Sequence, residues 1–237
     1  MLLNQSNIDQ IDFWKGAVIL INKPYGFSSF KLVYEVRKAI CKGTDKKLKI
    51  GHAGTLDPLA TGLLILCAGS MTKKIDQYQG MEKLYSGKIM LGASRPTFDM
   101  ESEIDFNFET SHISKVMMEE VRIGFLGEQM MIPPIHSAVK VKGQRAYQLA
   151  RDGKEVSLNP RPIVIHRFDI DTLNFPEIQF EVSCSKGTYI RSLASEFGKR
   201  LQSGAYLSAL RRDAIGNYRL EDAWDLVKLK GRLKLPT

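Results

Sequence analysis

The chain has 237 residues, enough for one large domain or for a domain with a small appendage. Hydrophobic residues make up 43% of it, which allows a substantial core and excludes a globally disordered protein. The net charge of +8 favours an anionic partner, either a nucleic acid or a membrane surface.

The first part of the chain predicts a tail, a strand and a helix. Residues 1–14 are polar and are expected to fray, whereas residues 17–21 have the apolar run of a buried strand. Ser28 or Ser29 can cap a helix that runs to about Cys41. The side chains expected on the apolar face of this helix are Phe30, Val33, Val36 and Ile40.

The rest of the chain predicts strands joined by helices and long loops. Strands outnumber helices, which predicts an α+β fold with a mixed, mostly antiparallel sheet core and flanking helices and loops. There is no repeat, low-complexity tract or linker, so we expect a single domain over residues 1–237. Strands are predicted at about 84–91, 139–141, 162–172, 178–184 and 207–212, and helices at 114–125, 147–150, 189–201 and 221–230.

The cysteines and the N-terminus indicate a cytoplasmic protein. Cys41, Cys67 and Cys184 are odd in number and lack metal-ligand spacing, and we expect Cys67 and Cys184 to be buried free thiols. Residues 1–13 lack the pattern of a signal peptide. The longest apolar run, residues 63–68, is far shorter than the ~20 residues of a membrane span. We therefore expect a soluble monomer that does not bind membranes.

The most informative segment is the glycine-bounded loop 51–62, with the sequence GHAGTLDPLATG. Its glycines allow close approach to a ligand, and Pro58 disfavours helical geometry at Asp57. A carboxylate held on rigid backbone next to the apolar residues 63–66 can serve as a catalytic acid, base or nucleophile. An Asp-Pro turn before a helix, with Thr55 or Asp57 as the cap, explains the same residues. The residues alone leave both interpretations open.

Segment 51–62 also resembles the signature of the TruB-type tRNA pseudouridine synthases, Gly-His-x-Gly-Thr-Leu-Asp-Pro-x-Ala-x-Gly, whose aspartate is catalytic. Further segments match that family in its order, and together they cover nearly the entire chain. They are the Lys-Pro-x-Gly turn in residues 16–29, the Lys-x-Tyr strand in 83–92, Pro-Pro-x-x-Ser-Ala-x-Lys in 133–151, Lys-Gly-Thr-Tyr-Ile-Arg in 184–193 and Leu-x-x-Leu-Arg-Arg in 207–212.

The resemblance implies a pseudouridine synthase fold and isomerisation of uridine 55 in the T loop of tRNA. In this reaction the glycosidic bond is cut, the base turns, and carbon 5 is joined to the ribose. Nothing is oxidised, so no metal or redox cofactor is expected. The carboxylate can attack the anomeric carbon, attack the pyrimidine ring, or stabilise a glycal-like species, and the sequence does not separate these routes.

The resemblance also assigns roles to individual residues. Asp57 is the catalytic carboxylate, Tyr85 stacks on the target base beside carbon 5, and Arg191 pairs with Asp57 and favours its ionised form. His52 fills the space left by the extruded nucleotide. Tyr189 and Leu210 line the pocket, and Lys23 supports it. The cations suited to phosphate contact are Lys42, Lys46, Lys47, Lys140, Lys142, Arg145, Arg151, Arg211 and Arg212.

Without the resemblance, these residues have ordinary structural interpretations. Tyr85 is a strand aromatic, Arg191 a helix-surface arginine, His52 a loop histidine and Leu210 a core leucine. The basic loop 41–49 is then a solvated surface loop.

The chain departs from the family pattern in two places. Arg95 and Ser102 replace a threonine and a glycine in residues 93–102, which we interpret as loop variation. The stretch after Arg212 is too short for the C-terminal RNA-binding domain of many relatives, so we expect the catalytic domain alone to bind the T-arm stem-loop.

Two alternatives remain open at this point. One is a non-catalytic tRNA-binding protein or folding chaperone that uses the same surface. The other is a glycoside hydrolase, which needs a second carboxylate, and the candidates for that role are Asp99 and Glu101.

Overall fold

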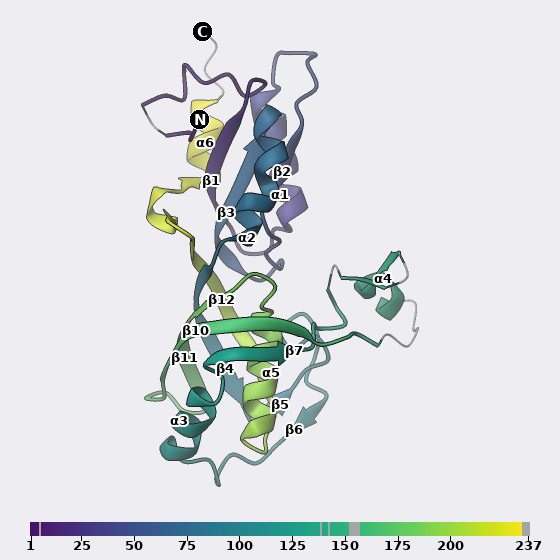
Figure 1. The fold of residues 1–237 in the computed structure, drawn as a ribbon, viewed down its shortest axis with the longest axis vertical. Coiled ribbons are helices and arrows are strands. Elements are labelled where there is room, and N and C mark those ends of the chain that lie inside the picture. The colour runs from purple at the N-terminus through teal and green to yellow at the C-terminus, as the bar shows by residue number, and fades with distance from the viewer. Residues whose placement is uncertain (5, 138, 142, 152–156, 234–237) are drawn as a thin grey trace. The chain divides into compact units, whose positions relative to one another are not determined.

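The computed structural model describes residues 1–4, 6–137, 139–141, 143–151 and 157–233 (Figure 1). Its strands form a mixed, mostly antiparallel sheet with helices beside it, which confirms the predicted α+β class. The chain divides into two compact units, the first made of residues 1–85 and 211–237 and the second of residues 86–210. The sequence predicted one domain. Two strands, β4 (Lys83–Leu91) and β12 (Ala205–Ile215), cross the unit boundaries along the chain.

The sheet of the first unit has the order β14-β1-β3-β12. Strands β1 and β3 pair antiparallel in a register from Ala17–Ala68 to Lys23–Gly62, and β12 joins β3 in parallel at Arg211–Thr61. Strand β2 adds to β3, and β13 adds to β12. The bounds are β1 Ala17–Lys23, β2 Ile50–His52, β3 Thr61–Ala68, β13 Tyr218–Arg219 and β14 Trp224–Asp225.

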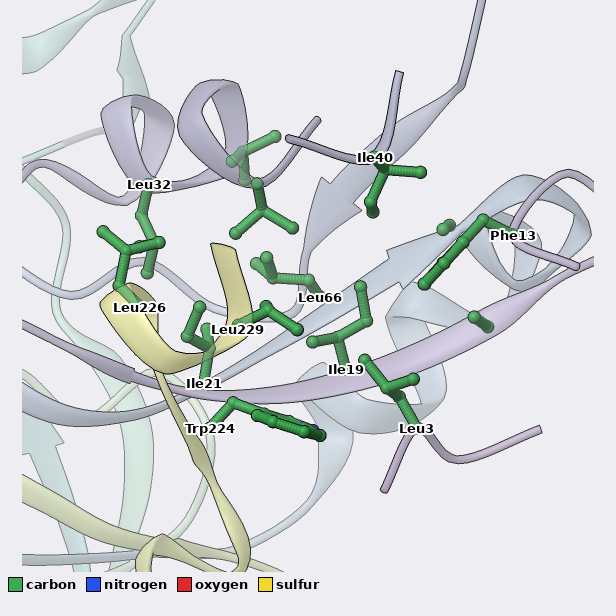
Figure 2. Close-up of a cluster of buried hydrophobic side chains, with 14 of the residues drawn as sticks. Leu3, Phe13, Ile19, Ile21, Leu32, Ile40, Leu66, Trp224, Leu226 and Leu229 are labelled. Atoms are coloured by element: carbon green, nitrogen blue, oxygen red, sulfur yellow. The ribbon is translucent and has the colours of Figure 1, made fainter. Parts of the chain in front are cut away.

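Helices α1 (Ser29–Ile40) and α6 (Leu226–Arg232) cover one face of β1 and β3, as Figure 2 shows. Ser28 caps α1 by accepting a hydrogen bond from the Lys31 amide, in agreement with the predicted start. Phe30 was expected on the buried face, but it is 74% exposed. Leu32 occupies the buried position instead, because the 3.6-residue period places it beside Val33 and Val36.

The expectation that residues 1–14 fray is wrong for the described part of that segment. Leu3, Ile8 and Phe13 are buried in the same core cluster (Figure 2 labels Leu3 and Phe13). The Leu3 amide donates to the Val18 carbonyl at 2.8 Å. Three widely spaced apolar side chains anchor a segment whose average composition is polar.

The opposite face of β1 and β3 is also covered. Val18 and Leu20 of β1 pack with Leu63 and Ile65 of β3, and Ile75 of α2 lies against them. Both faces are therefore buried, which explains the continuous apolar runs of these strands. The covering elements are the 3-10 helix η1 (Gly69–Lys74), α2 (Ile75–Gly80) and η2 (Leu220–Asp222).

The second unit has the strand order β12-β4-β11-β10-β7. Strands β10 and β11 pair antiparallel with an irregularity between Ile165 and Arg167, and the edge strand β7 was not predicted. An aromatic cluster of Phe125, Phe168 and Phe197 lies between helices and sheet. The bounds are α3 Lys115–Ile123, β7 Gly127–Met131, α4 Ala146–Arg151, β10 Arg161–Asp171, β11 Glu177–Cys184 and α5 Ile190–Arg200, with the short strands β5 Ala93–Ser94, β6 Phe106–Asn107, β8 Lys140–Val141 and β9 Gln144–Arg145.

Cys67 and Cys184 are buried thiols outside any disulfide, as predicted. No helix in the described ranges is long and apolar enough to cross a membrane.

Candidate active site

Asp57 lies in a tight loop between β2 and β3, which are antiparallel neighbours. The Ala53 amide donates to the Ile65 carbonyl at 2.9 Å, and the Ala60 amide donates to the Asp57 carbonyl at 3.1 Å. Gly54 has φ +101°, which favours glycine. The element after the loop is strand β3, so the interpretation of Asp57 as a cap before a helix is wrong.

The ammonium of Lys23 holds one side of this loop. Lys23 is fully buried, and its Nζ donates to the carbonyls of Phe27 at 2.6 Å, Pro24 at 3.1 Å and Pro58 at 3.2 Å. Burial lowers the pKa of Lys23 to about 8, against the opposing effect of the Asp57 charge. Lys23 therefore ties the 24–27 turn to the residue after Asp57.

Ser29 holds the residue before Asp57. Its hydroxyl accepts a hydrogen bond from the Leu56 amide at 2.9 Å and donates to the Leu56 carbonyl at 3.0 Å. The Gly26 amide also donates to the Pro58 carbonyl at 2.9 Å. The backbone is therefore bonded on both sides of the half-buried Asp57.

Arg212 holds the beginning of the loop. Its guanidinium is 1% exposed and donates to the carbonyls of Leu63 at 2.8 Å, Gly54 at 3.1 Å and Thr55 at 3.5 Å. Arg212 was predicted to be one of the cations that contact phosphate. That prediction is wrong because its side chain is buried. Residues alternate sides along a strand, so its neighbour Arg211 is exposed, where it pairs with Asp213 at 2.6 Å.

Tyr85 and His52 lie in the same unit. Tyr85 is 8% exposed, and its ring centroid is 6.0 Å from the Arg212 guanidinium carbon. His52 ends β2, opposite Leu66. Burial lowers the pKa of His52, the charge of Arg212 lowers it further, and a backbone hydrogen bond with Gly54 opposes the shift. The environment thus favours a neutral imidazole.

Arg191, in the second unit, is 4% exposed and makes contacts in several directions. Its Nε lies 3.6 Å from the Asp99 carboxylate, and it donates to the carbonyls of Thr97 at 3.1 Å and His136 at 2.9 Å. Residues 93–102 were interpreted as loop variation, and Asp99 was not predicted to be a partner of Arg191. The available signal was an aspartate that persists in an otherwise divergent stretch.

The remaining predicted residues also lie in the second unit. Tyr189 is half-buried and immediately precedes α5, and its amide donates to the Met131 sulfur at 3.3 Å. Leu210 is half-buried in β12. Lys140 begins β8, and its side chain lies outside the described part of the structure, as do the side chains of Arg145 and Arg151 and the whole of Lys142. The expected pairing of Arg191 with Asp57 joins residues of different units and stays a prediction.

The described residues contain no group of three or more histidine, cysteine, aspartate or glutamate side chains arranged to hold a metal ion. At the Asp57 loop, the described residues of the first unit supply one carboxylate on an anchored backbone, the buried ring of Tyr85, and the buried cations Lys23 and Arg212.

Comparison with solved structures shows that the fold is that of the pseudouridine synthases. In the "Crystal Structure of a Cbf5-Nop10-Gar1 Complex", a chain aligns with a TM-score of 0.70 at 25% identity over 92% of this chain. The alignment covers 54% of that chain, so this protein spans about half its length.

Sequence comparison identifies the family. Residues 39–190 match the TruB family pseudouridylate synthase (N terminal domain). The tRNA pseudouridine synthase B of Flavobacterium johnsoniae is 47% identical over 225 residues, which cover 94% of this chain and 98% of the relative. The protein of that name from Bacteroides fragilis is 48% identical over 219 residues, or 92% and 94% of the two chains. The chain belongs to the TruB family of pseudouridylate synthases, which are isomerases.

Proposed function

We propose that this protein isomerises the T-loop uridine of tRNA, position 55, to pseudouridine. The observation that carries the proposal is the anchoring of the Asp57 loop by Lys23, Ser29 and Arg212. A carboxylate on backbone that is bonded on both sides is held in place before substrate arrives, and this lowers the cost of reaching the reactive geometry.

The reaction needs one carboxylate and balances without a cofactor. The bond from N1 of uracil to the anomeric carbon breaks, and the base turns. A bond then forms from carbon 5 to the anomeric carbon. The proton on carbon 5 leaves, and N1 gains one. Asp57 acts either as a nucleophile or as the stabiliser of a charged or glycal-like species.

The other site residues have supporting roles in this proposal. Tyr85 stacks on the uracil, and its hydroxyl lies near the carbon 5 proton. Arg191, held by Asp99, pairs with Asp57 and favours the ionised carboxylate. His52 occupies the space of the extruded nucleotide. Tyr189 and Leu210 bound the pocket, and Lys140 and Arg211 contact the RNA backbone.

The T-arm stem-loop is the proposed binding partner, and we expect the protein to act on it in the cytoplasm as a monomer. The net charge of +8 supports an RNA partner. A neutral His52 also suits insertion among stacked bases, because an uncharged ring loses less hydration than an imidazolium.

Tritium release tests this function. tRNA labelled at carbon 5 of uridine is incubated with wild-type protein and with Asp57→Asn, which keeps the size of the side chain but removes its charge. We expect release from position 55 by the wild type alone, with tRNA affinity within about threefold between the two proteins because the anchoring contacts involve backbone and other side chains. Substantial release by Asp57→Asn would remove Asp57 from its role. Tight tRNA binding without release by either protein would overturn the isomerase function.

A further inference from the structure

The outer face of α1 carries aromatic and basic side chains that the proposed active site does not use. We define this α1 outer face as Phe30, Lys31, Tyr34 and Lys38. Phe30 is 74% and Tyr34 48% exposed, and both lysines are exposed. The spacing i, i+4, i+8 places Phe30, Tyr34 and Lys38 in one row. The opposite side of α1 packs into the core, where Figure 2 shows Leu32.

This face is positively charged. Glu35, the one acidic residue within α1, pairs with Lys230 of α6 at 2.5 Å. Lys31 extends over the Phe27 ring, with its Nζ 4.3 Å from the centroid, so a cation lies beside the aromatic row. Two large exposed aromatic side chains on a short helix add no core packing, and exposed apolar area of this kind marks interaction sites.

The face begins next to the Asp57 loop. Ser29, which bonds both backbone groups of Leu56, immediately precedes Phe30. With a rise of about 1.5 Å per residue, the row from Phe30 to Lys38 extends roughly 12 Å along α1. Nucleotides next to one held at Asp57 therefore fall within reach of this row.

We propose that the α1 outer face stacks unpaired bases of the RNA substrate next to the target uridine. The proposal rests on the proposed function. Phe30 and Tyr34 supply flat rings that accept any base, and Lys31 and Lys38 supply the charge that phosphates require. The combination of exposed rings with exposed cations on one face favours single-stranded RNA over an apolar protein partner, for which charges in the contact are costly.

The test compares binding and turnover with two RNAs, a T-arm hairpin and a fully paired duplex of equal length. The variants are Phe30→Ala/Tyr34→Ala and Phe30→Leu/Tyr34→Leu, which keeps apolar bulk but removes the rings. The matched control is Val116→Ala, because Val116 is 67% exposed on α3 in the other unit. We expect both double variants to bind the hairpin more weakly by about fivefold or more for each ring lost, with an increase in KM and little change in kcat. Duplex binding and the control should stay within about twofold of wild type.

A Phe30→Trp variant gives a direct readout. Hairpin binding should quench its fluorescence beyond the quenching seen in wild type, which contains Trp14 and Trp224. Base stacking would be overturned if both double variants bound the hairpin with unchanged affinity, or if the leucine variant retained the wild-type affinity. It would also be overturned if the substitutions changed only the self-association of the protein. If wild type releases tritium while the double variants bind normally, the isomerase stands and this inference fails. If wild type binds the hairpin through these rings but releases no tritium, the stacking inference stands and the isomerase function fails.

Discussion

Two buried cations, Lys23 and Arg212, hold the Asp57 loop in place. Lys23 and Arg212 are each almost completely inaccessible, and each donates to several backbone carbonyls. Carbonyls in a tight loop cannot all pair with other backbone amides, and leaving them without a donor in the interior is costly. These two side chains therefore stabilise a backbone shape that no regular element could supply.

Lys23 predicts a pH dependence of stability. Burial lowers its pKa from 10.5 to about 8, so between these values the unfolded chain binds more protons than the folded protein. The free energy of unfolding contributed by this group therefore rises with pH in that window. We expect the free energy of unfolding of wild type, relative to that of Lys23→Met, to increase by roughly 3 kcal/mol from pH 8 to 10.5 in urea titrations. Burial raises the pKa of Cys67 to about 11 and that of Tyr78 to about 12. Both groups are present in wild type and in Lys23→Met, so their contributions to the pH dependence cancel in the difference. A pH-independent difference would contradict this assignment.

Arg212 and Arg211 provide a matched pair of adjacent substitutions. Arg212→Lys replaces a planar fork that reaches three carbonyls with a single ammonium, and we expect about 2–4 kcal/mol of destabilisation. Arg211→Lys changes an exposed side chain that can still pair with Asp213, so its effect should stay within about 0.5 kcal/mol. Urea midpoints and m-values measure both. Equal effects would mean that the guanidinium contacts do not stabilise the loop.

At the scale of elements, the parallel pairing of β3 with β12 decides where the Asp57 loop ends. Gly62 lies opposite Arg212, directly after the first pair Thr61–Arg211, and has φ +102°. A Cβ atom there would lie 2.4 Å from the Arg212 carbonyl oxygen, which is backbone and cannot move aside alone. The close approach of two strands therefore requires glycine at this position.

Gly62→Ala should disrupt this junction. We expect a loss of about 3 kcal/mol or more in the free energy of unfolding, because both φ and the contact are unfavourable. Gly80→Ala is the control, because Gly80 ends α2 and a Cβ atom there would enter open space. Apart from its chain neighbours and its own helix, no atom of the described residues lies within 4 Å of that position. It should change stability by less than about 1 kcal/mol. Thermal denaturation of the two variants distinguishes them. If Gly62→Ala were as stable as wild type, β3 and β12 would be able to separate at this point without loss of the fold.

At the scale of the whole molecule, the net charge of +8 predicts salt-dependent RNA binding. Each phosphate contact contributes about 0.7–0.9 to the slope of log affinity against log salt. Arg211→Ala should reduce the slope for a T-arm hairpin by about one. Arg167→Ala is the control, because Arg167 is also an exposed strand arginine that is paired with an acid, Glu181 at 3.0 Å. Equal slopes for the two variants would exclude Arg211 from the RNA contact.

Much of the fold follows from local patterns in the sequence. The apolar run of β1, the Ser28 cap of α1 and the strand patterns at about 162–172 and 178–184 are local signals, and each predicted its element. The apolar residues 63–66 were noted next to the Asp57 loop but were not predicted to form a strand, which they do in β3. Edge strand β7 was missed, because its exposed residues lack an apolar pattern. The tail was misjudged because three isolated apolar residues anchor it, which average composition conceals.

Sequence patterns were enough to identify the family and to place Asp57 in a glycine-bounded loop, because both depend on motifs and short-range spacing. The folded chain was needed to show that Arg212 is buried, that Lys23 and Ser29 bond the two sides of the Asp57 loop, and that Asp99 holds Arg191. Each of these contacts joins residues far apart in the chain or depends on burial. Local sequence patterns carry no information about which distant carbonyl or carboxylate a side chain will meet.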